Sequence, residues 1–460
     1  MNIHHDMTRG PIGRELVFLS LPLILAHVLQ LLYGVADMLV VSRFVGEAGV
    51  AAVSNGNMVA FLVASFCMGF SSGGAVVVGR HASGEHGQAR ERAIRTLLFL
   101  SLLFSLVVGA GSVALCGPVL GGLDVPPEAM TDALVYTRIV CAGTVFVFGQ
   151  HAVCAVLRAL GSGKGPLLLT ALSAVLNIVL DLLFVGLWGM RTEGAAMATV
   201  ISQAAAFGAA LFFLRKGCHQ ECREACLQRT GGTRGEGVFT ESRRWAVAVL
   251  RTALPASAQM VAVNVAFLIV TAMLNRYGVA VAAASGIGLK INTLAAMPCW
   301  GIGQAMTVMV AQNVGAGDWA RVKAVLWKGM GLNMAVTASI VVVVQLFAVP
   351  IMELFAPAGS DMARVGVEYL RLCCSVNCIG YVAMYCFDSF ALGVGRADIA
   401  LMNSLLEAFA ARLFFAWLGA EVVGMGYAGI YAGQAVSPFI PALCGWIFYR
   451  RGSWRDSVGK

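Results

Sequence analysis

A few polar side chains inside otherwise apolar stretches could bind a proton or a small cation. Asp37 follows Tyr33 by four residues in YGVADMLVVSR, and Asp181 follows Asn177 by four residues in LSAVLNIVLDLLF. In a helix, this spacing places both members of each pair on one face. Burial disfavours the charged form of a carboxylic acid, so such a group can take up and release a proton. We therefore predict that Tyr33, Asp37, Asn177 and Asp181 form a site for proton or cation coupling, with a structural pair at Asp181 as the alternative.

A second set of polar residues lies in later apolar stretches. Glu407 and Arg412 occur in SLLEAFAARLFF, and Lys290 occurs in GIGLKINTLAAMP. Opposite charges could form a buried pair or a small network, which would be either structural or in contact with substrate. Two amides complete this set of candidates, Gln259 and Asn264.

Other titratable groups receive a structural interpretation. Asp388 lies near Arg396 in sequence, so we interpret it as a partly solvated structural charge. Three cysteines spaced by four lie beside His219, and we interpret them as one face of an amphipathic helix rather than a metal site: Cys218, Cys222 and Cys226. We expect no metal and no cofactor, and no nucleophile or phosphate-loop motif indicates an enzyme.

The elements that position these groups must cross a membrane. The chain has 460 residues, of which 59% are hydrophobic and only 12% are charged, whereas about a quarter of the residues in a soluble domain are charged. The mean hydropathy is +0.80. Long uncharged runs can each provide the roughly 20 apolar residues of a spanning helix. They lack the alternation of an outer-membrane barrel, so we predict an all-α membrane protein.

Twelve spans are expected in two groups of six. The polar segment 215–245 would link an N-terminal bundle, 1–214, to a C-terminal bundle, 246–460, which ends in a short basic tail. The predicted spans are 15–42, 53–79, 94–119, 131–157, 166–188, 194–214, 246–275, 280–312, 324–350, 365–391, 398–420 and 423–449.

The distribution of arginine and lysine predicts the orientation of these spans. Basic residues favour the cytoplasmic side of a membrane, and most of them fall in the segments that share a side with both termini. We therefore expect both termini to be cytoplasmic in a plasma or inner membrane. The formal net charge of +8 then follows from topology and does not indicate a nucleic-acid partner.

The two halves repeat several short motifs. ALGSGK at 159–164 corresponds to ALGVGR at 391–396, and Leu21-Pro22 corresponds to Leu254-Pro255. Duplicated membrane domains are typical of transporters that work by alternating access. Proline removes a backbone hydrogen bond and can bend a helix, so we predict that Pro22 and Pro255 act as matched hinges.

The motifs resemble those of the multidrug and toxic compound extrusion (MATE) family along nearly the whole chain. They are LPLIL followed by VADMLVVSRFVGEAGVAAVS, then VGRHASGEHGQARERA, LRALGSGKGPLLLTALSAVLNIVLDLLF, GAAMATVISQ and VAQNVGAGDWARVKA. The resemblance implies two six-helix bundles facing each other in a V. It also implies export of lipophilic, often cationic compounds, driven by protons or sodium. We expect the transporter to act as a monomer.

The first half matches the family pattern residue by residue. The proline and acid of helix 1 correspond to Pro22 and Asp37, and the Asn-x-x-x-Asp of helix 5 corresponds to Asn177 and Asp181. This trio of polar residues resembles the DNA-damage-inducible-F-type branch, in which it is implicated in proton coupling.

The second half departs from the sodium-driven branch. That branch has a glutamate soon after the helix 7 proline, where this chain has only Gln259 and Asn264, and no acid clearly matches its helix 10 aspartate. Glu407 with Arg412 resembles a pattern in some clostridial-type members. We therefore expect protons rather than sodium as the coupling ion.

Three other functions compete with drug export. A lipid or lipid-linked glycan flippase of the same superfamily would have more basic residues in its cavity than Lys290 and Arg412. A major-facilitator transporter would carry a charged Gly/Asp/Arg loop after helix 2, where this chain has GRHASGEHGQAR. A channel would not need duplicated lobes with buried acids, and uphill transport would distinguish it from a carrier.

Overall fold

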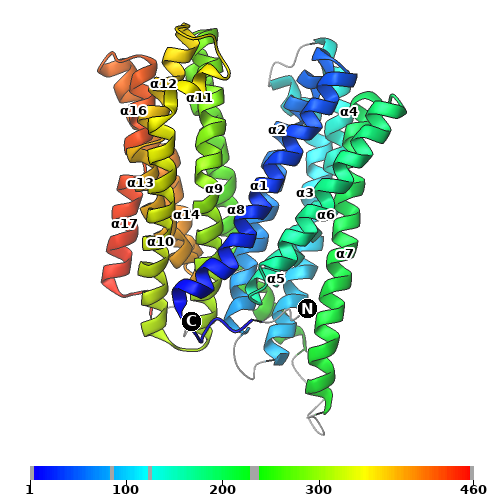
Figure 1. The fold of residues 1–460 in the computed structure, drawn as a ribbon. Helices are drawn as coiled ribbons and strands as arrows, with labels where there is room; N and C mark the ends of the chain where they lie inside the picture. The colour runs from blue at the N-terminus through cyan, green and yellow to red at the C-terminus, as the bar shows by residue number, and fades with distance from the viewer. Residues whose placement is uncertain (1–4, 83–86, 123–126, 228–237, 456–460) are drawn as a thin grey trace. The chain divides into compact units, whose positions relative to one another are not determined.

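The computed structural model describes residues 5–82, 87–122, 127–227 and 238–455, and every regular element in these ranges is a helix (Figure 1). Ten of the helices are long and apolar enough to cross a membrane. Two further helix pairs, bent by 45° and 44°, would bring the number of spans to twelve. The prediction of an all-α protein with twelve spans is confirmed.

The chain divides into two compact units, and the first contains residues 1–6 and 25–257. Its core lies between α2, α3 and α5, where Phe70 packs against Phe104 and Phe148 with ring centroids 4.8 and 5.5 Å apart. The helices that lie wholly in unit 1 are α2 (Glu47–Arg80), α3 (Gly87–Gly122), α4 (Pro127–Ala142), α5 (Thr144–Ala159), α6 (Lys164–Asp181), the π-helix η1 (Leu182–Leu187) and α7 (Arg191–Leu227).

The second unit contains residues 7–24 and 258–460. Its largest core cluster joins α9, α10 and α13 and includes the fully buried Phe390 and Trp454. The helices that lie wholly in unit 2 are α9 (Val279–Gly315), α10 (Trp319–Leu346), α11 (Ala348–Glu353), α12 (Asp361–Cys373), α13 (Val376–Gly393), α14 (Ala397–Leu405), η2 (Leu406–Leu413), α15 (Phe414–Trp417), η3 (Leu418–Val422), α16 (Tyr427–Val436) and α17 (Phe439–Arg451).

Two long helices are shared between the units. α1 (Ile12–Phe44) belongs to unit 2 as far as Ile24 and to unit 1 from Leu25 onward. α8 (Val238–Asn275) belongs to unit 1 through Ser257 and to unit 2 from Ala258 onward. The units therefore differ from the predicted 1–214 and 246–460 bundles at the first helix of each half. The physical reason is that the beginning of each helix is buried in the core of the other unit, as Leu19 is in unit 2 and Ala253 in unit 1.

Glycines allow these shared helices to pack closely. Gly69 and Gly73 of α2, spaced by four, face the backbone of α8, where a Cβ atom would overlap the carbonyl oxygens of Ala256 and Thr252. Small residues at this spacing are a common way for membrane helices to approach each other. In unit 2, Gly301 of α9 meets Ile24 of α1 in the corresponding position.

The repeated ALGxG motifs end the bent helix pairs. Helices α4 and α5 break at Gly143, and α12 and α13 break between Cys373 and Val376. α5 then ends at Ala159 and α13 ends at Gly393, so each motif turns the chain into the next helix. Gly161 and Gly395 have φ of +87° and +76°, a conformation that glycine adopts without strain.

Large apolar side chains cover the outside of each unit. In unit 1, Leu39 and Phe99 are 65% and 66% exposed, and in unit 2, Leu346 is 72% exposed. A water-soluble protein rarely exposes extended apolar surface, whereas lipid tails accept it. The chain is therefore a multi-pass membrane protein.

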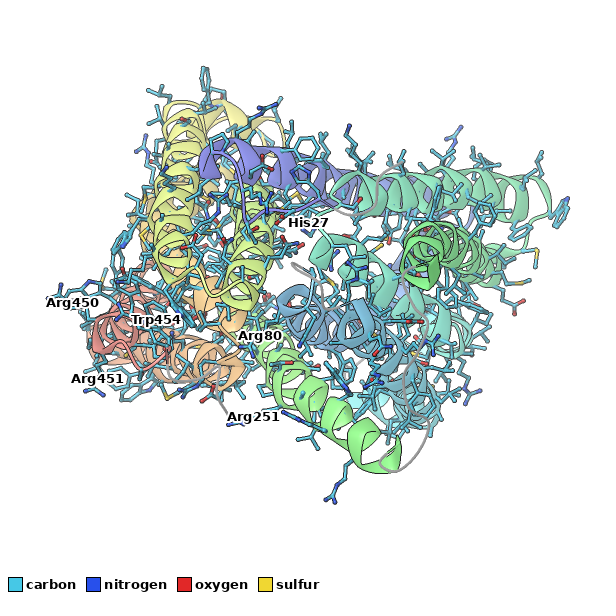
Figure 2. The ribbon with its side chains drawn as sticks, turned by 90° about the horizontal axis from the view of Figure 1, so that it is seen from below. His27, Arg80, Arg251, Arg450, Arg451 and Trp454 are labelled. Carbon is cyan, nitrogen blue, oxygen red and sulfur yellow. The ribbon has the colours of Figure 1, made fainter. Side chains whose placement is uncertain are left out.

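Basic side chains mark the ends of some helices. Arg450 and Arg451 occupy the last turn of α17, and Arg80 occupies the last turn of α2 (Figure 2). Cations are stabilised at helix C-termini by the helix dipole. Trp454 folds back under α17 and donates from its indole N–H to the carbonyl oxygen of Tyr449 at 3.0 Å.

The predicted linker 215–245 is helical in its described parts. α7 extends to Leu227, and α8 begins at Val238. The side chains of the candidate cluster lie outside the described residues, and these are Cys218, His219, Cys222 and Cys226.

Candidate functional site

The predicted coupling residues of the first half come together inside unit 1. Asp37 lies on α1, while Asn177 and Asp181 lie one turn apart on α6. Their exposed fractions are 5%, 1% and 0%. The apolar sequence around them buries the three polar side chains because the rest of each helix face packs against its neighbours.

The two carboxyl groups face each other. Asp37 and Asp181 lie within hydrogen-bonding contact of one another. If both groups were ionised, neither could donate a hydrogen bond to the other. Oδ1 of Asp37 and both carboxyl oxygens of Asp181 would then be buried without a hydrogen-bond donor. Neither acid forms an ion pair with any residue that the structure describes. A proton shared between the two groups, or a bound cation, would satisfy this geometry.

The polar surroundings of this acid pair include residues that the sequence analysis missed. The hydroxyl of Tyr136 on α4 donates to Oδ1 of Asn57 on α2 at 2.9 Å. Nδ2 of Asn177 reaches Oγ1 of Thr199 on α7 at 3.5 Å. Tyr33 and Tyr136 both interact electrostatically with the two acids. Asn57 and Thr199 are ordinary polar residues in apolar helices, and only the fold shows that they face the same place.

Both predicted hinge prolines lie next to the points where helices change units. Pro22 lies inside α1, two residues before Ile24, the last residue of that helix in unit 2. Pro255 lies inside α8, two residues before Ser257, the last residue of that helix in unit 1. Because proline has no backbone N–H, each helix lacks one backbone hydrogen bond close to the residue at which it passes from one unit to the other.

In unit 2, Glu407 and Arg412 form a buried ion pair. Nε and Nη2 of Arg412 donate to Oε1 of Glu407 at 3.0 and 2.6 Å, and Ser437 Oγ donates to the same oxygen at 3.0 Å. The guanidinium also lies 4.1 Å from the centroid of the Phe267 ring. The two residues belong to the π-helix η2, in which hydrogen bonds run from i to i+5, so residues five apart share a face.

The other candidates of the second half occupy different surroundings. Lys290 on α9 is exposed and forms no ion pair with a described residue, so it lies outside the Glu407–Arg412 pair. Because Arg412 already neutralises Glu407 on the same helix, that pair needs no third charge. Nδ2 of Asn264 donates to the carbonyl oxygen of Met260 within α8 at 2.8 Å.

Asp388 was interpreted wrongly from the sequence. It is only 3% exposed, and Arg396 pairs with Asp398 at 2.7 Å instead. Nδ2 of Asn403 donates to Asp388 at 2.9 Å, and Oγ of Ser404 donates at 3.4 Å. Closeness in sequence did not predict contact, because α13 turns this carboxyl group inward toward α14.

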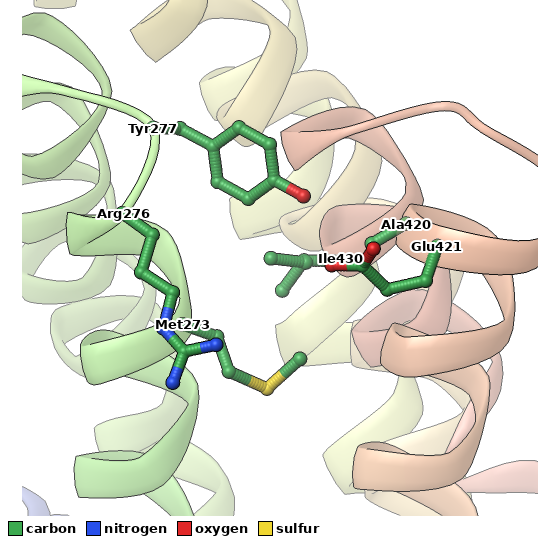
Figure 3. Close-up of a pocket in the computed structure, with 6 residues that line it drawn as sticks. All are labelled: Met273, Arg276, Tyr277, Ala420, Glu421 and Ile430. Atoms are coloured by element: carbon green, nitrogen blue, oxygen red, sulfur yellow. The ribbon is translucent and has the colours of Figure 1, made fainter.

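A pocket of about 350 Å³ opens at the end of α8 in unit 2 (Figure 3). Arg276, which directly follows the last residue of α8, and Glu421 of η3 both line it, as does Tyr277 (Figure 3). Met273 and Ile430 add apolar side chains to its lining. Its lining therefore combines opposite charges with apolar side chains, a small amphiphilic site that the sequence analysis did not anticipate.

Comparison with known proteins places these features in one family. The MatE family model matches residues 22–183 and 255–418, one match in each half. The probable multidrug resistance protein YpnP of Bacillus subtilis is 25% identical over 463 residues, covering 98% of each chain. A protein named FAD transporter from Shewanella oneidensis is 23% identical over 84% of this chain and 83% of its own. The fold is similar to that of a solved MOP superfamily transporter from Pyrococcus furiosus, with a TM-score of 0.87, 20% identity and coverage of 100% of this chain and 99% of that chain.

Proposed function

Because this chain belongs to the MatE family of membrane transporters, we propose that it exports lipophilic, often cationic organic compounds in exchange for protons. The family consists of transporters rather than enzymes, and relatives that match almost the whole chain are named multidrug resistance proteins. The net process is translocation by alternating access, in which no bond of the substrate is made or broken.

The facing carboxyl groups of Asp37 and Asp181 support proton coupling. Two buried carboxylates in contact repel each other, and each lacks a neighbouring cation in the described chain. A proton relieves that repulsion without needing new space. Loading and unloading this proton gives the transporter two states of different internal charge, which is what coupling requires.

In the proposed cycle, the proton controls the outer part of α1. A shared proton holds Asp37 against Asp181 and therefore holds α1 against α6. Loss of the proton separates the acids and releases α1, and Pro22 gives that helix a place to bend. Substrate and proton then occupy unit 1 alternately, so that uptake of one favours release of the other.

We propose an inner-membrane location with both termini in the cytoplasm and a functional monomer. The basic residues that support this orientation include Arg450 and Arg451 at the end of α17 and Arg80 at the end of α2. Positive residues favour the cytoplasmic side of short loops.

A phosphate-bearing substrate is the second candidate, because one relative is named FAD transporter. An anionic substrate, like the lipid-linked substrate of a flippase, would need a cation to receive it. Of the two basic candidates of the second half, Arg412 is already paired with Glu407, which leaves only Lys290 for such a ligand. This pairing favours a neutral or cationic substrate.

Transport of a cationic dye by the purified protein in liposomes tests the proposal. The pH gradient and the sodium gradient are varied independently. Accumulation that follows the pH gradient and ignores sodium is expected. Accumulation that follows sodium alone would contradict proton exchange, and downhill movement alone would indicate a channel.

A further inference from the structure

Unit 2 also contains a buried acid that has no cationic partner among the described residues, like the acid pair in unit 1. Asp388 on α13 is 3% exposed, and none of the described lysines, arginines or histidines pairs with it. Its two hydrogen-bond donors, Asn403 and Ser404 on α14, are both neutral. A carboxylate with only neutral partners is costly at membrane depth.

The buried arginine near Asp388 in sequence, Arg412, already forms an ion pair with Glu407. Arg412 gives both Nε and Nη2 to Oε1 of Glu407, which also accepts from Ser437. Glu407 is therefore stabilised as an anion, and its charge acts on Asp388. Glu407 thus has a cationic partner, whereas Asp388 has only neutral ones, so a proton on Asp388 would remove an uncompensated buried charge. The titratable groups that face Asp388 are Glu407 of η2 and, on α13 itself, Tyr385 and Cys386.

An unpartnered acceptor marks the same place. Oδ1 of Asn403 is buried and has no hydrogen-bond partner, although its Nδ2 binds Asp388 at 2.9 Å. Buried polar atoms are almost always hydrogen-bonded, so an orphan acceptor indicates a missing donor. A protonated Asp388 would add one donor to this group of side chains, whereas a carboxylate adds none.

The Asp388 carboxyl group is linked to the hinge region of α8. Ser404 Oγ donates to Oδ2 of Asp388 at 3.4 Å and accepts from Nε2 of Gln259 at 2.8 Å. Gln259 lies four residues after Pro255, in the first turn of α8 that belongs to unit 2. A proton on Oδ2 reverses the bond, because the acid then donates to Ser404 and the serine hydroxyl must turn to another acceptor.

We propose that Asp388 is a second proton-binding group, located in unit 2, whose protonation is transmitted through Ser404 to Gln259 on α8. A proton fits better than an alkali ion, because it occupies only one carboxyl oxygen and leaves the hydrogen bond from Asn403 to the other oxygen in place. The role of this group in transport rests on the proposed proton exchange, whereas the binding of the proton does not.

Infrared difference spectroscopy of the purified full-length chain, titrated with acid in lipid, tests proton binding without any transport. The protonated carboxyl groups of buried acids give a carbonyl band separate from that of solvated acids. We expect D388N to remove one component of this band, D37N to remove a different one, and D37N/D388N to remove both. The matched control D361N changes an exposed acid of the same unit, with 80% of its side chain accessible, and should leave the buried components unchanged.

S404A keeps the carboxyl group and removes one donor, so it should shift the position of the Asp388 component without removing it. This variant keeps the test valid if D388N folds poorly. A titration that D388N and S404A both leave unchanged would overturn the proposal. Loss of the Asp388 component on addition of sodium chloride would also overturn it, because the site would then hold an alkali ion. Failure of proton-driven dye transport, with the Asp388 component present, would count against the proposed function alone.

Discussion

The carboxyl groups of Asp37 on α1 and Asp181 on α6 contact each other in the buried interior of unit 1. Neither has a positively charged partner in the part of the chain that the structure describes. Because like charges repel strongly at low dielectric, the pair is expected to hold a proton or a cation in at least one state of the transporter.

Breaking the ion pair of unit 2 should destabilise the protein. E407Q leaves the buried guanidinium of Arg412 without a counter-charge, which typically costs about 3–5 kcal/mol. Replacing both partners, as in E407L/R412M, should restore most of that loss, because an apolar pair needs no neutralisation. Thermal unfolding of the purified variants measures both effects.

The surface pair Asp361–Arg364 provides the control for this experiment. Its side chains are 80% and 61% accessible, and R364M should change the stability by no more than about 1 kcal/mol. A double variant as unstable as E407Q would show that the ion pair itself, rather than charge balance, is needed.

Packing between α2 and α8 should not tolerate a side chain at Gly73. G73A places a methyl group against the backbone of Thr252, and such overpacking typically costs about 1–3 kcal/mol. G111A on α3 meets no atom within 4 Å and should stabilise its helix by up to about 1 kcal/mol. The fraction of each variant that stays monodisperse after heating measures this difference in stability. Equal fractions for G73A and G111A would contradict the close contact between α2 and α8.

Replacing either hinge proline should slow transport without unfolding the protein. P22A and P255A restore a backbone N–H in helices that already continue through these positions. A stiffer helix should lower the transport rate severalfold, because hinge residues absorb the backbone change during opening and closing. P118A on α3, a helix that lies within unit 1, is the matched control. A P22A variant that transports at the normal rate would show that Pro22 does not act as a hinge.

The sequence predicted the fold and the shared face of Asn177 and Asp181 because both follow from simple periodicities. Apolar length gave the spans, and a spacing of four placed Asn177 and Asp181 on one helix face. Their meeting with Asp37 required only that α1 and α6 pack together, and the family pattern implied the same grouping.

The remaining features could not be derived from those periodicities. Glu407 and Arg412 are five residues apart, which an α-helix would place on different faces, and only the π-helix η2 brings them together. Asp388 is close to Arg396 in sequence, but in the turn after α13 that arginine forms its ion pair with Asp398. The shared helices α1 and α8 depend on contacts between segments far apart in sequence, such as Ile24 with Gly301.

Dye accumulation in liposomes with an acidic interior, measured for the wild-type chain, D37N, D181N and the exposed control D361N, tests the central claim most directly. The wild type and D361N should concentrate the dye above the external level, and a protonophore should abolish this accumulation. D37N and D181N should be present in the membrane in equal amount and folded, but should accumulate no more dye than empty liposomes. Undiminished, protonophore-sensitive accumulation by D37N would contradict proton coupling through the Asp37–Asp181 pair.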